Sequence, residues 1–272
     1  MTVVKHAAVA VVLVAMAIAV GPANLGAQSI EQFDKSYPFI GHWDTEINNP
    51  VGQDRGNCGG RLGDWGEKLL NCAMPIDQLP LNGRGEAWLK YMDHRQSPVM
   101  AECAQLAVPA LLSADSYWNA ALTELVIFYA DPSGLIERHI YMDGRKHPDP
   151  SELFQHGHSI GWWDGDDLVV ETTNFTFDPD GTDEHLHMAS SVRKKVTERY
   201  HIIDDNTMRI IITLDDSTFL TRPFTWAFYL AKKPGGAPTA WRACDPVSGR
   251  NEVYSAYPGN KYGEDDQPGV KP

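Results

Sequence analysis

A short stretch near the middle of the chain, HSIGWWDGDDLVVETTNF, concentrates side chains that can do chemistry. It runs from His158 to Phe175 and holds a histidine, two adjacent tryptophans and four acidic residues. The dipeptide Asp164-Gly165 suits a two-residue type I′ turn, because glycine accepts a positive φ, and alternating side chains flank it on both sides. The stretch therefore predicts a β-hairpin.

The predicted hairpin gathers functional groups on one face. With this turn His158 lies opposite Glu171, and Trp162 lies opposite Asp167; opposed residues share a face, with Cβ atoms about 5 Å apart. One face then carries His156, His158, Trp162, Asp167 and Glu171, and the other carries Ser159, Gly161, Trp163, Leu168, Val170 and Asn174. A three-residue turn would instead place His158 opposite Thr172.

A histidine beside a glutamate is a workable proton-transfer pair. The carboxylate fixes the imidazole tautomer and raises the imidazole pKa, and a tryptophan on the same face supplies a stacking surface. If this face lines the inside of a barrel, His158 is the proton-transfer residue and Glu171 its orienting partner. On a wet outer face the same two residues would form an ordinary surface pair, worth roughly a few tenths of a kcal/mol.

Further candidates lie outside the hairpin. The segment DGRKHP needs only its glycine and proline to turn, so Asp143, Arg145 and His147 are free to bind a ligand at a barrel rim; the alternative is a solvated basic turn. We assign anion stabilisation to Arg145 and Arg199. The predicted substrate-binding residues are Trp162, Trp163, Asp143, His147 and His187.

Two His-x-His pairs raise the question of a metal. In a strand, His156 with His158 and His185 with His187 would each point two imidazoles to one side, which suits zinc or copper. Neither pair lies in a secure strand, so we expect no metal and no cofactor, with a metal-dependent enzyme as an alternative. The chain also has no serine-hydrolase elbow, phosphate-binding glycine loop, dinucleotide fingerprint or HExxH motif.

The N-terminus has the pattern of a signal peptide. A basic start at Lys5, an apolar run over residues 7–20 and small residues before position 28 predict cleavage after residue 27. Loss of Lys5 takes the formal net charge from −13 to −14, which opposes binding to nucleic acid or anionic membranes. We expect a periplasmic or secreted protein without membrane insertion after cleavage.

All four cysteines follow the predicted signal peptide, so export would place them in an oxidising compartment. Two disulfides with three possible connectivities are expected. A local Cys58–Cys72 link would close a glycine-rich loop and leave Cys103–Cys244 as a long-range link.

The remaining pattern predicts an all-β fold. Short strands alternate with turns such as DPSG, DPDG and KKPGG from about residue 117 onward, which favours an antiparallel meander closed as a barrel over a sandwich. Gly41-His42-Trp43 resembles the Gly-x-Trp start of lipocalin-like barrels. We expect one barrel domain over residues 28–250, with a Gly- and Cys-rich excursion before residue 80, a short helix within 85–95 and an extended or disordered tail over 251–272.

The ordered motifs RHIYMDGRKHP, GHSIGWWDGDD, VTERY and DDSTFLTRPFTW resemble a family of exported, mostly uncharacterised bacterial proteins. The match covers roughly residues 100–250 and marks as family positions Arg138, Asp143, Arg145, His147, His158, Trp163, Glu198 and Arg199. The chain departs from the family pattern at Asp167, at Ser217 and in the displaced His185 or His187. The resemblance supplies positions and no reaction.

Together these features predict an exported enzyme that acts on a small, largely apolar, aromatic molecule by cofactor-free acid–base chemistry, as a lyase, hydratase or isomerase does. A non-catalytic ligand-binding barrel is the alternative from a different class. An inward His158 next to arginine side chains favours the enzyme, and an inward face of only Trp, Leu and Val favours the carrier.

Overall fold

The computed structural model describes residues 31–45, 70–71, 78–131, 133–183, 188–236 and 244–256, apart from residues 32, 94 and 96. The predicted signal peptide at residues 1–27, the cysteines Cys58 and Cys72, and the histidines His185 and His187 lie outside the described residues. What the sequence predicts for them stays a prediction.

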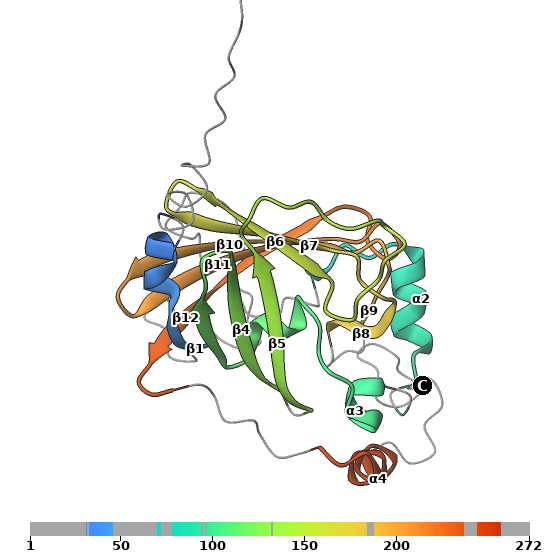
Figure 1. Ribbon diagram of the computed structural model, residues 1–272. Coiled ribbons are helices and arrows are strands. Elements are labelled where there is room, and N and C mark those ends of the chain that lie inside the picture. Colours follow the sequence, from blue (N-terminus) through green and yellow to red (C-terminus); the bar gives the residue numbers. More distant parts are fainter. Residues whose placement is uncertain are drawn as a thin grey trace, which may run out of the picture.

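A closed barrel forms the body of the molecule (Figure 1). Within the described residues, nine strands follow one another around the wall, and the last pairs back onto the first. In wall order they are β1 (Gly41–Thr45), β3 (Ser116–Ala120), β4 (Glu124–Asp131), β5 (Gly134–Tyr141), β6 (His158–Asp164), β7 (Asp167–Thr173), β10 (Lys195–Asp204), β11 (Thr207–Asp215) and β12 (Phe224–Lys233). The predicted all-β, lipocalin-like barrel is confirmed.

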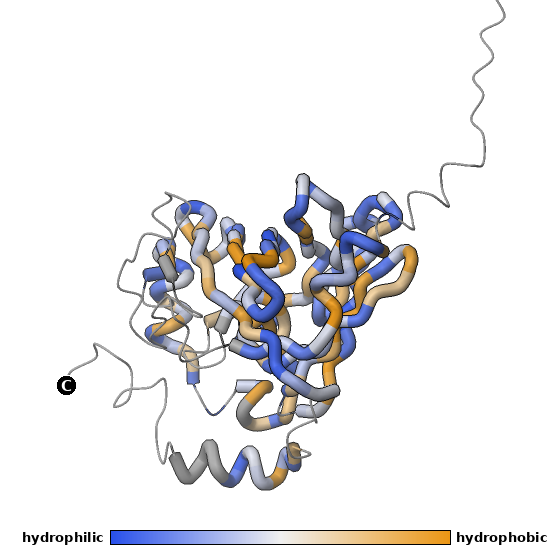
Figure 2. Tube along the Cα trace, turned by 90° about the vertical axis from the view of Figure 1, so that its left-hand side faces the viewer, coloured by the Kyte–Doolittle hydropathy of each residue, from blue (hydrophilic) through white to orange (hydrophobic). Residues whose placement is uncertain are grey.

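Alternating side chains fill the barrel interior. In β11, Met208, Ile210, Ile212 and Leu214 are fully buried, and the tube in Figure 2 changes repeatedly between hydrophilic and hydrophobic colours as the chain runs through the strands. This period of two is what buries one face of each strand. Trp43 has no solvent exposure, and its indole Nε1 donates a hydrogen bond to the carbonyl oxygen of Phe39.

The nine-stranded wall is antiparallel, as predicted, except for one neighbouring pair that is parallel. β5 and β6 share two residue pairs, Ile140 with Ser159 and Tyr141 with Ile160. Residues 142–157 connect the two strands and form the long crossover that a parallel pair requires. The DGRKHP turn signal marks a change of direction, but it does not show whether the chain then returns antiparallel.

Short elements accompany the wall strands, and some of them place side chains in the barrel core. The described residues outside the wall strands form β2 (Leu70–Asn71), β8 (Asp178–Asp183), β9 (Met188–Ser190), the 3-10 helices η1 (Tyr37–Phe39) and η4 (Ala110–Ser113), and the helices α2 (Gly83–Tyr91), α3 (Pro98–Glu102) and α4 (Pro246–Ala256). No helix among them is long and apolar enough to span a bilayer.

The short helix expected within residues 85–95 is α2. It begins after Asn82, whose side chain accepts hydrogen bonds from the backbone N–H groups of Arg84 and Gly85. The predicted extended tail is wrong for its first residues, 251–256, because they belong to α4. The rest of that tail lies outside the described residues.

The long-range disulfide is present. Cys103, just after α3, is bonded to Cys244, just before α4, across 141 positions of the sequence. The bond indicates an oxidising compartment. The second predicted disulfide, Cys58–Cys72, lies outside the described residues.

Candidate functional site

The hairpin turn is shifted by one position from the predicted one. Gly165 and Asp166 form the two-residue turn, Gly165 has a φ of 65°, and Asp164 pairs with Asp167. The predicted register is therefore wrong: His158 lies opposite Thr173, and Glu171 lies opposite Ile160. The sum of paired residue numbers changes by two, so each residue keeps its predicted side of the hairpin.

Of the two alternatives that the sequence left open for the His158 face, the structure shows the outer one. The buried face carries Ser159, Leu168, Val170 and Thr172, whereas His158 and Glu171 are partly exposed. Leu168 and Val170 join the barrel core, and this apolar pair decides which side of the hairpin faces inward. The residues proposed for chemistry therefore lie on the outer wall of the barrel.

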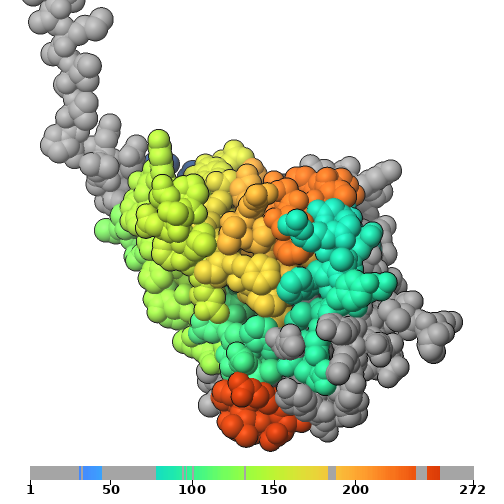
Figure 3. Space-filling view, turned by 90° about the vertical axis from the view of Figure 1, so that its right-hand side faces the viewer, coloured from blue at the N-terminus to red at the C-terminus, as the bar shows by residue number. Residues whose placement is uncertain are grey.

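The crossover between β5 and β6 brings a second histidine to His158. His147 lies in the crossover, which runs over the surface and appears in lime in Figure 3. The Nδ1 atoms of His147 and His158 are 3.0 Å apart, so one of them donates a hydrogen bond and the other accepts it.

Glu171 contacts His147 and not His158. Its Oε1 lies 3.4 Å from Nε2 of His147, a buried nitrogen without a well-formed hydrogen bond to any described residue. The negative charge of the carboxylate favours a proton on this Nε2. Nδ1 of His147 then accepts from Nδ1–H of His158, which leaves Nε2 of His158 unprotonated. No described residue hydrogen-bonds to that Nε2.

The surroundings of His158 favour its neutral form. Burial lowers its pKa below the usual 6.5, and the neighbouring His147 and Arg145 lower it further, against a smaller opposite effect of Asp143. At neutral pH the imidazole therefore has a free lone pair on Nε2 and can accept a proton.

Aromatic rings surround the same imidazole. Tyr141 stacks against His158 with ring centroids 5.1 Å apart, and the Phe154 ring lies 6.3 Å away. The pairing of Tyr141 with Ile160 places the last residue of β5 beside the first residues of β6 and explains the stack. Tyr141 and Phe154 were missed by the sequence prediction. The signal for Tyr141 is its place at a strand end, immediately before the DGRKHP segment.

Arg145 completes this group. Its guanidinium lies 3.8 Å from the centroid of the Tyr141 ring, and its Nε and Nη2 donate to the carboxylate of Asp143. Hydrogen bonds from Arg145 lower the pKa of Asp143, which keeps both groups charged. Nη1 of Arg145 makes no hydrogen bond to a described residue, so one edge of the guanidinium is open to a ligand.

Three predicted site residues lie elsewhere. Arg199 donates to Asp164 and Asp167 at the turn end of the hairpin, and Trp162 is 43% exposed on the same outer face. Trp163 points toward the core and contacts Phe39, with ring centroids 5.7 Å apart. His187 is outside the described residues. The structure thus brings together Asp143, Arg145, His147, His158 and Glu171.

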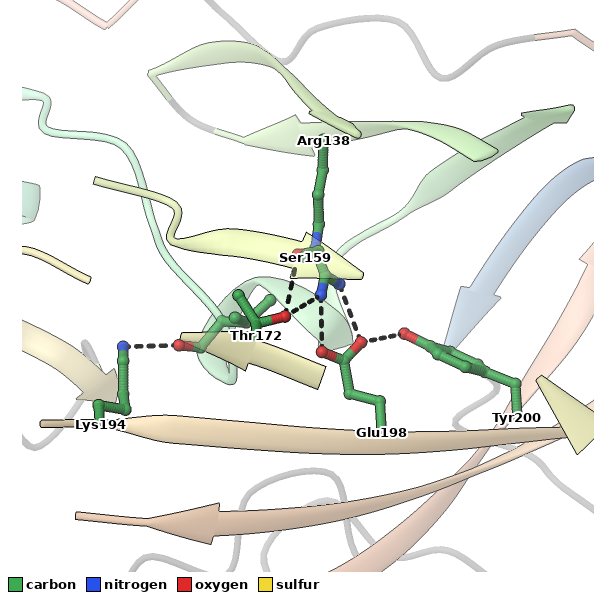
Figure 4. A network of polar contacts seen from close by, with 7 residues as sticks. Arg138, Ser159, Thr172, Lys194, Glu198 and Tyr200 are labelled. Atoms are coloured by element: carbon green, nitrogen blue, oxygen red, sulfur yellow. Dashed lines mark hydrogen bonds and ion pairs between the residues drawn. The ribbon is translucent and has the colours of Figure 1, made fainter. Parts of the chain in front are cut away.

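A separate polar network lies inside the barrel (Figure 4). Arg138 of β5 donates to both carboxylate oxygens of Glu198, to Ser159 and to Thr172, and Tyr200 donates to Glu198. Arg138 is 3% exposed and Glu198 is fully buried. Burial disfavours the charge of Arg138, but the facing carboxylate outweighs it and raises its pKa. Arg138 and Glu198 therefore form a buried ion pair.

No family model matches the chain, and no curated protein or solved structure is significantly similar to it. Among the described residues, no three His, Cys, Asp or Glu side chains gather in a way that could hold a metal ion. The functional argument therefore depends on the geometry around His158.

Proposed function

We propose that this protein is an exported enzyme that acts on a small, largely apolar, aromatic molecule by cofactor-free acid–base chemistry of the lyase, hydratase or isomerase type. The observation that carries the proposal is the chain of contacts from Glu171 through His147 to His158, which ends in a lone pair on Nε2 of His158. Export to the periplasm or the medium is proposed from the N-terminal pattern and is supported by the Cys103–Cys244 disulfide.

Each group has a role in proton abstraction. Nε2 of His158 takes a proton from the substrate, while Nδ1 of His147 accepts a hydrogen bond from Nδ1–H of His158. Glu171 stabilises the positive charge that develops on the two rings. Arg145 stabilises negative charge on the substrate through its open Nη1 edge. Tyr141 and Phe154 supply ring surfaces next to the base, which suits a flat apolar substrate.

The barrel interior does not favour a lipocalin-type carrier. Its inward side chains join one continuous buried cluster, so a ligand in the lumen would have to displace packed side chains. Neither of the two outcomes expected from the sequence is met, because His158 lies on the outer face and the inward face carries Ser159 and Thr172 bonded to Arg138 beside its apolar residues.

The test is solvent deuterium exchange into small aromatic compounds that have an acidic C–H beside a carbonyl group, followed by NMR in D₂O. Wild-type protein should catalyse exchange, and His158→Ala should reduce the rate by about 10²–10⁴-fold, because a positioned general base contributes that much. Glu171→Gln should reduce it less, since this carboxylate acts through His147. The double variant should be no slower than His158→Ala. Equal exchange in wild type and His158→Ala would refute the proposal.

The pH dependence has a defined sign. The unprotonated form of His158 is the active one, and its pKa lies below 6.5. Exchange should therefore be constant near neutral pH and should fall as the pH drops through that lowered value. A profile that falls with rising pH across this range would show that the protonated imidazole is the active form.

A further inference from the structure

Glu171 is shared between two groups that compete for its charge. One carboxylate oxygen, Oε1, lies 3.4 Å from Nε2 of His147, and the other, Oε2, lies 3.4 Å from Nζ of Lys195. Lys195 is the first residue of β10, and the pairing of Thr197 with Glu171 places it diagonally across from the carboxylate. Both side chains are partly exposed, at 45% for Lys195 and 29% for Glu171.

The side chains around the histidine pair come from four segments, three of which contribute charged groups. The crossover contributes the ion pair of Asp143 and Arg145, and β5 contributes the neutral Tyr141. The carboxylate of Glu171 comes from β7, and the ammonium of Lys195 comes from β10. Arg145 lowers the pKa of His158 more than Asp143 raises it. Of the remaining two charges, Glu171 contacts His147 directly and Lys195 contacts Glu171.

We propose that Lys195 is a positioning residue that keeps the histidine pair in its neutral, proton-accepting form. Its ammonium contacts Oε2 of Glu171 and so offsets part of the carboxylate charge that faces His147. The inference rests on the proposed function, because it concerns the same base. Without the ammonium, Glu171 faces only the imidazoles, and its full charge favours a proton on the pair. The hydrogen bond between the two Nδ1 atoms needs one of them unprotonated, because two N–H groups there would repel each other. One extra proton on the pair is therefore placed on Nε2 of His158, the atom that acts as the base.

The experiment is an NMR titration of the imidazole C–H signals, which needs no substrate. In Lys195→Met the midpoint of the His158 titration should move to higher pH by about half a unit, because the Glu171 carboxylate then faces only the imidazoles. Lys195→Arg keeps the charge and should restore the wild-type midpoint. Lys90→Met, a matched loss of one exposed lysine charge on α2, should leave it unchanged.

Two results would overturn the inference. One is an unchanged His158 midpoint in Lys195→Met, or an equal shift in Lys90→Met, which would indicate only a net-charge effect. The other is a full Lys195→Met shift in a Glu171→Gln background, because Lys195 would then act without the carboxylate. The result is separable from the proposed function: a normal Lys195-dependent shift in a protein without exchange activity refutes the enzyme and keeps the electrostatic role.

Discussion

Lys194 and Lys195 are neighbours in the sequence with opposite surroundings. Lys194 is 1% exposed; its Nζ donates to the carbonyl oxygens of Val108 and Gly181 and lies over the ring of Phe175. Lys195 points to the other side, as successive residues entering a strand do, and meets Glu171 near solvent. Two adjacent lysines therefore have different roles: Lys194 links two buried segments, and Lys195 contacts a carboxylate near the surface.

The burial of Lys194 predicts a pH-dependent stability. Burial lowers its pKa from 10.5 to about 7, while Asp178 and Asp216 act in the opposite direction. Between these two pH values the unfolded chain holds a proton that the folded protein has lost, so this group makes the protein more stable as pH rises, by at most about 1.4 kcal/mol per pH unit.

The comparison is urea unfolding of wild type and Lys194→Met between pH 7 and 9.5. The wild-type free energy of unfolding should rise relative to that of the variant across this range. The two carbonyl groups left without a donor should lower the stability of Lys194→Met by an amount that does not depend on pH. Parallel curves would show that Lys194 stays charged in the folded protein.

At the residue scale, the sequence predicts which hairpin residues share a side, but it does not predict which side faces the barrel core. The alternation around the turn assigned His158, Trp162 and Glu171 to one side, and a register shift of two kept that assignment. Both sides mix polar and aromatic residues, and the signal that marks the buried side is the apolar pair Leu168 and Val170. His147 was expected to bind substrate, and its position between Glu171 and His158 depends on a crossover whose path is not encoded in local spacing.

At the element scale, the contact between β5 and β6 is the shortest in the barrel wall among the described strands. Two residue pairs join these strands, whereas β6 and β7 share seven. Arg138 crosses this weak contact from inside, with bonds to Ser159 on β6, Thr172 on β7 and Glu198 on β10. The buried ion pair thus connects four strands where backbone pairing is sparse.

Loss of one partner of this ion pair should be strongly destabilising. Arg138→Met leaves Glu198 charged, buried and without its cation, which typically costs about 3–5 kcal/mol. Adding Glu198→Leu removes that unpaired charge, so the double variant should recover much of the loss. Denaturant unfolding of both single variants and the double variant measures the coupling. Additive effects of the two substitutions would show that the pair does not act as a unit.

The close approach of β5 and β6 also limits side-chain size. A Cβ atom at Gly161 would lie 2.5 Å from the sulfur of Met142 and 2.8 Å from Cγ2 of Ile140. Gly161→Ala should therefore lower the free energy of unfolding by about 1–3 kcal/mol through overpacking. Gly165→Ala at the hairpin turn is a useful comparison, because its cost would come from the positive φ and not from a clash. Wild-type stability of Gly161→Ala would mean that Met142 can move aside freely.

The strands themselves could be predicted from the sequence, because period-two hydrophobicity and turn residues are local signals. The parallel pairing of β5 with β6 could not, since the connection 142–157 is long enough for either a crossover or a wide antiparallel loop. This one connection decides where His147 and Arg145 lie relative to His158. The site was therefore harder to predict than the barrel.

At the scale of the whole molecule, the C-terminal helix α4 lies against α3. Arg250 forms an exposed ion pair with Glu102, which contributes little on its own. The disulfide from Cys103 to Cys244 is the covalent link between these two elements, and it closes the chain across 141 positions. It therefore ties the helix and the segment before it to the layer that covers one side of the barrel.

The last prediction is that this disulfide carries a substantial share of the stability. Closing so long a loop reduces the entropy of the unfolded chain, so Cys103→Ala with Cys244→Ala should lower the free energy of unfolding by about 2–5 kcal/mol. Cys58 and Cys72 stay in place, which makes the comparison specific for this bond. Because the barrel closes through β1 and β12 without the disulfide, the variant should keep its far-UV spectrum and its His158 titration. Loss of β-structure in the variant would instead show that the barrel needs the bond to fold.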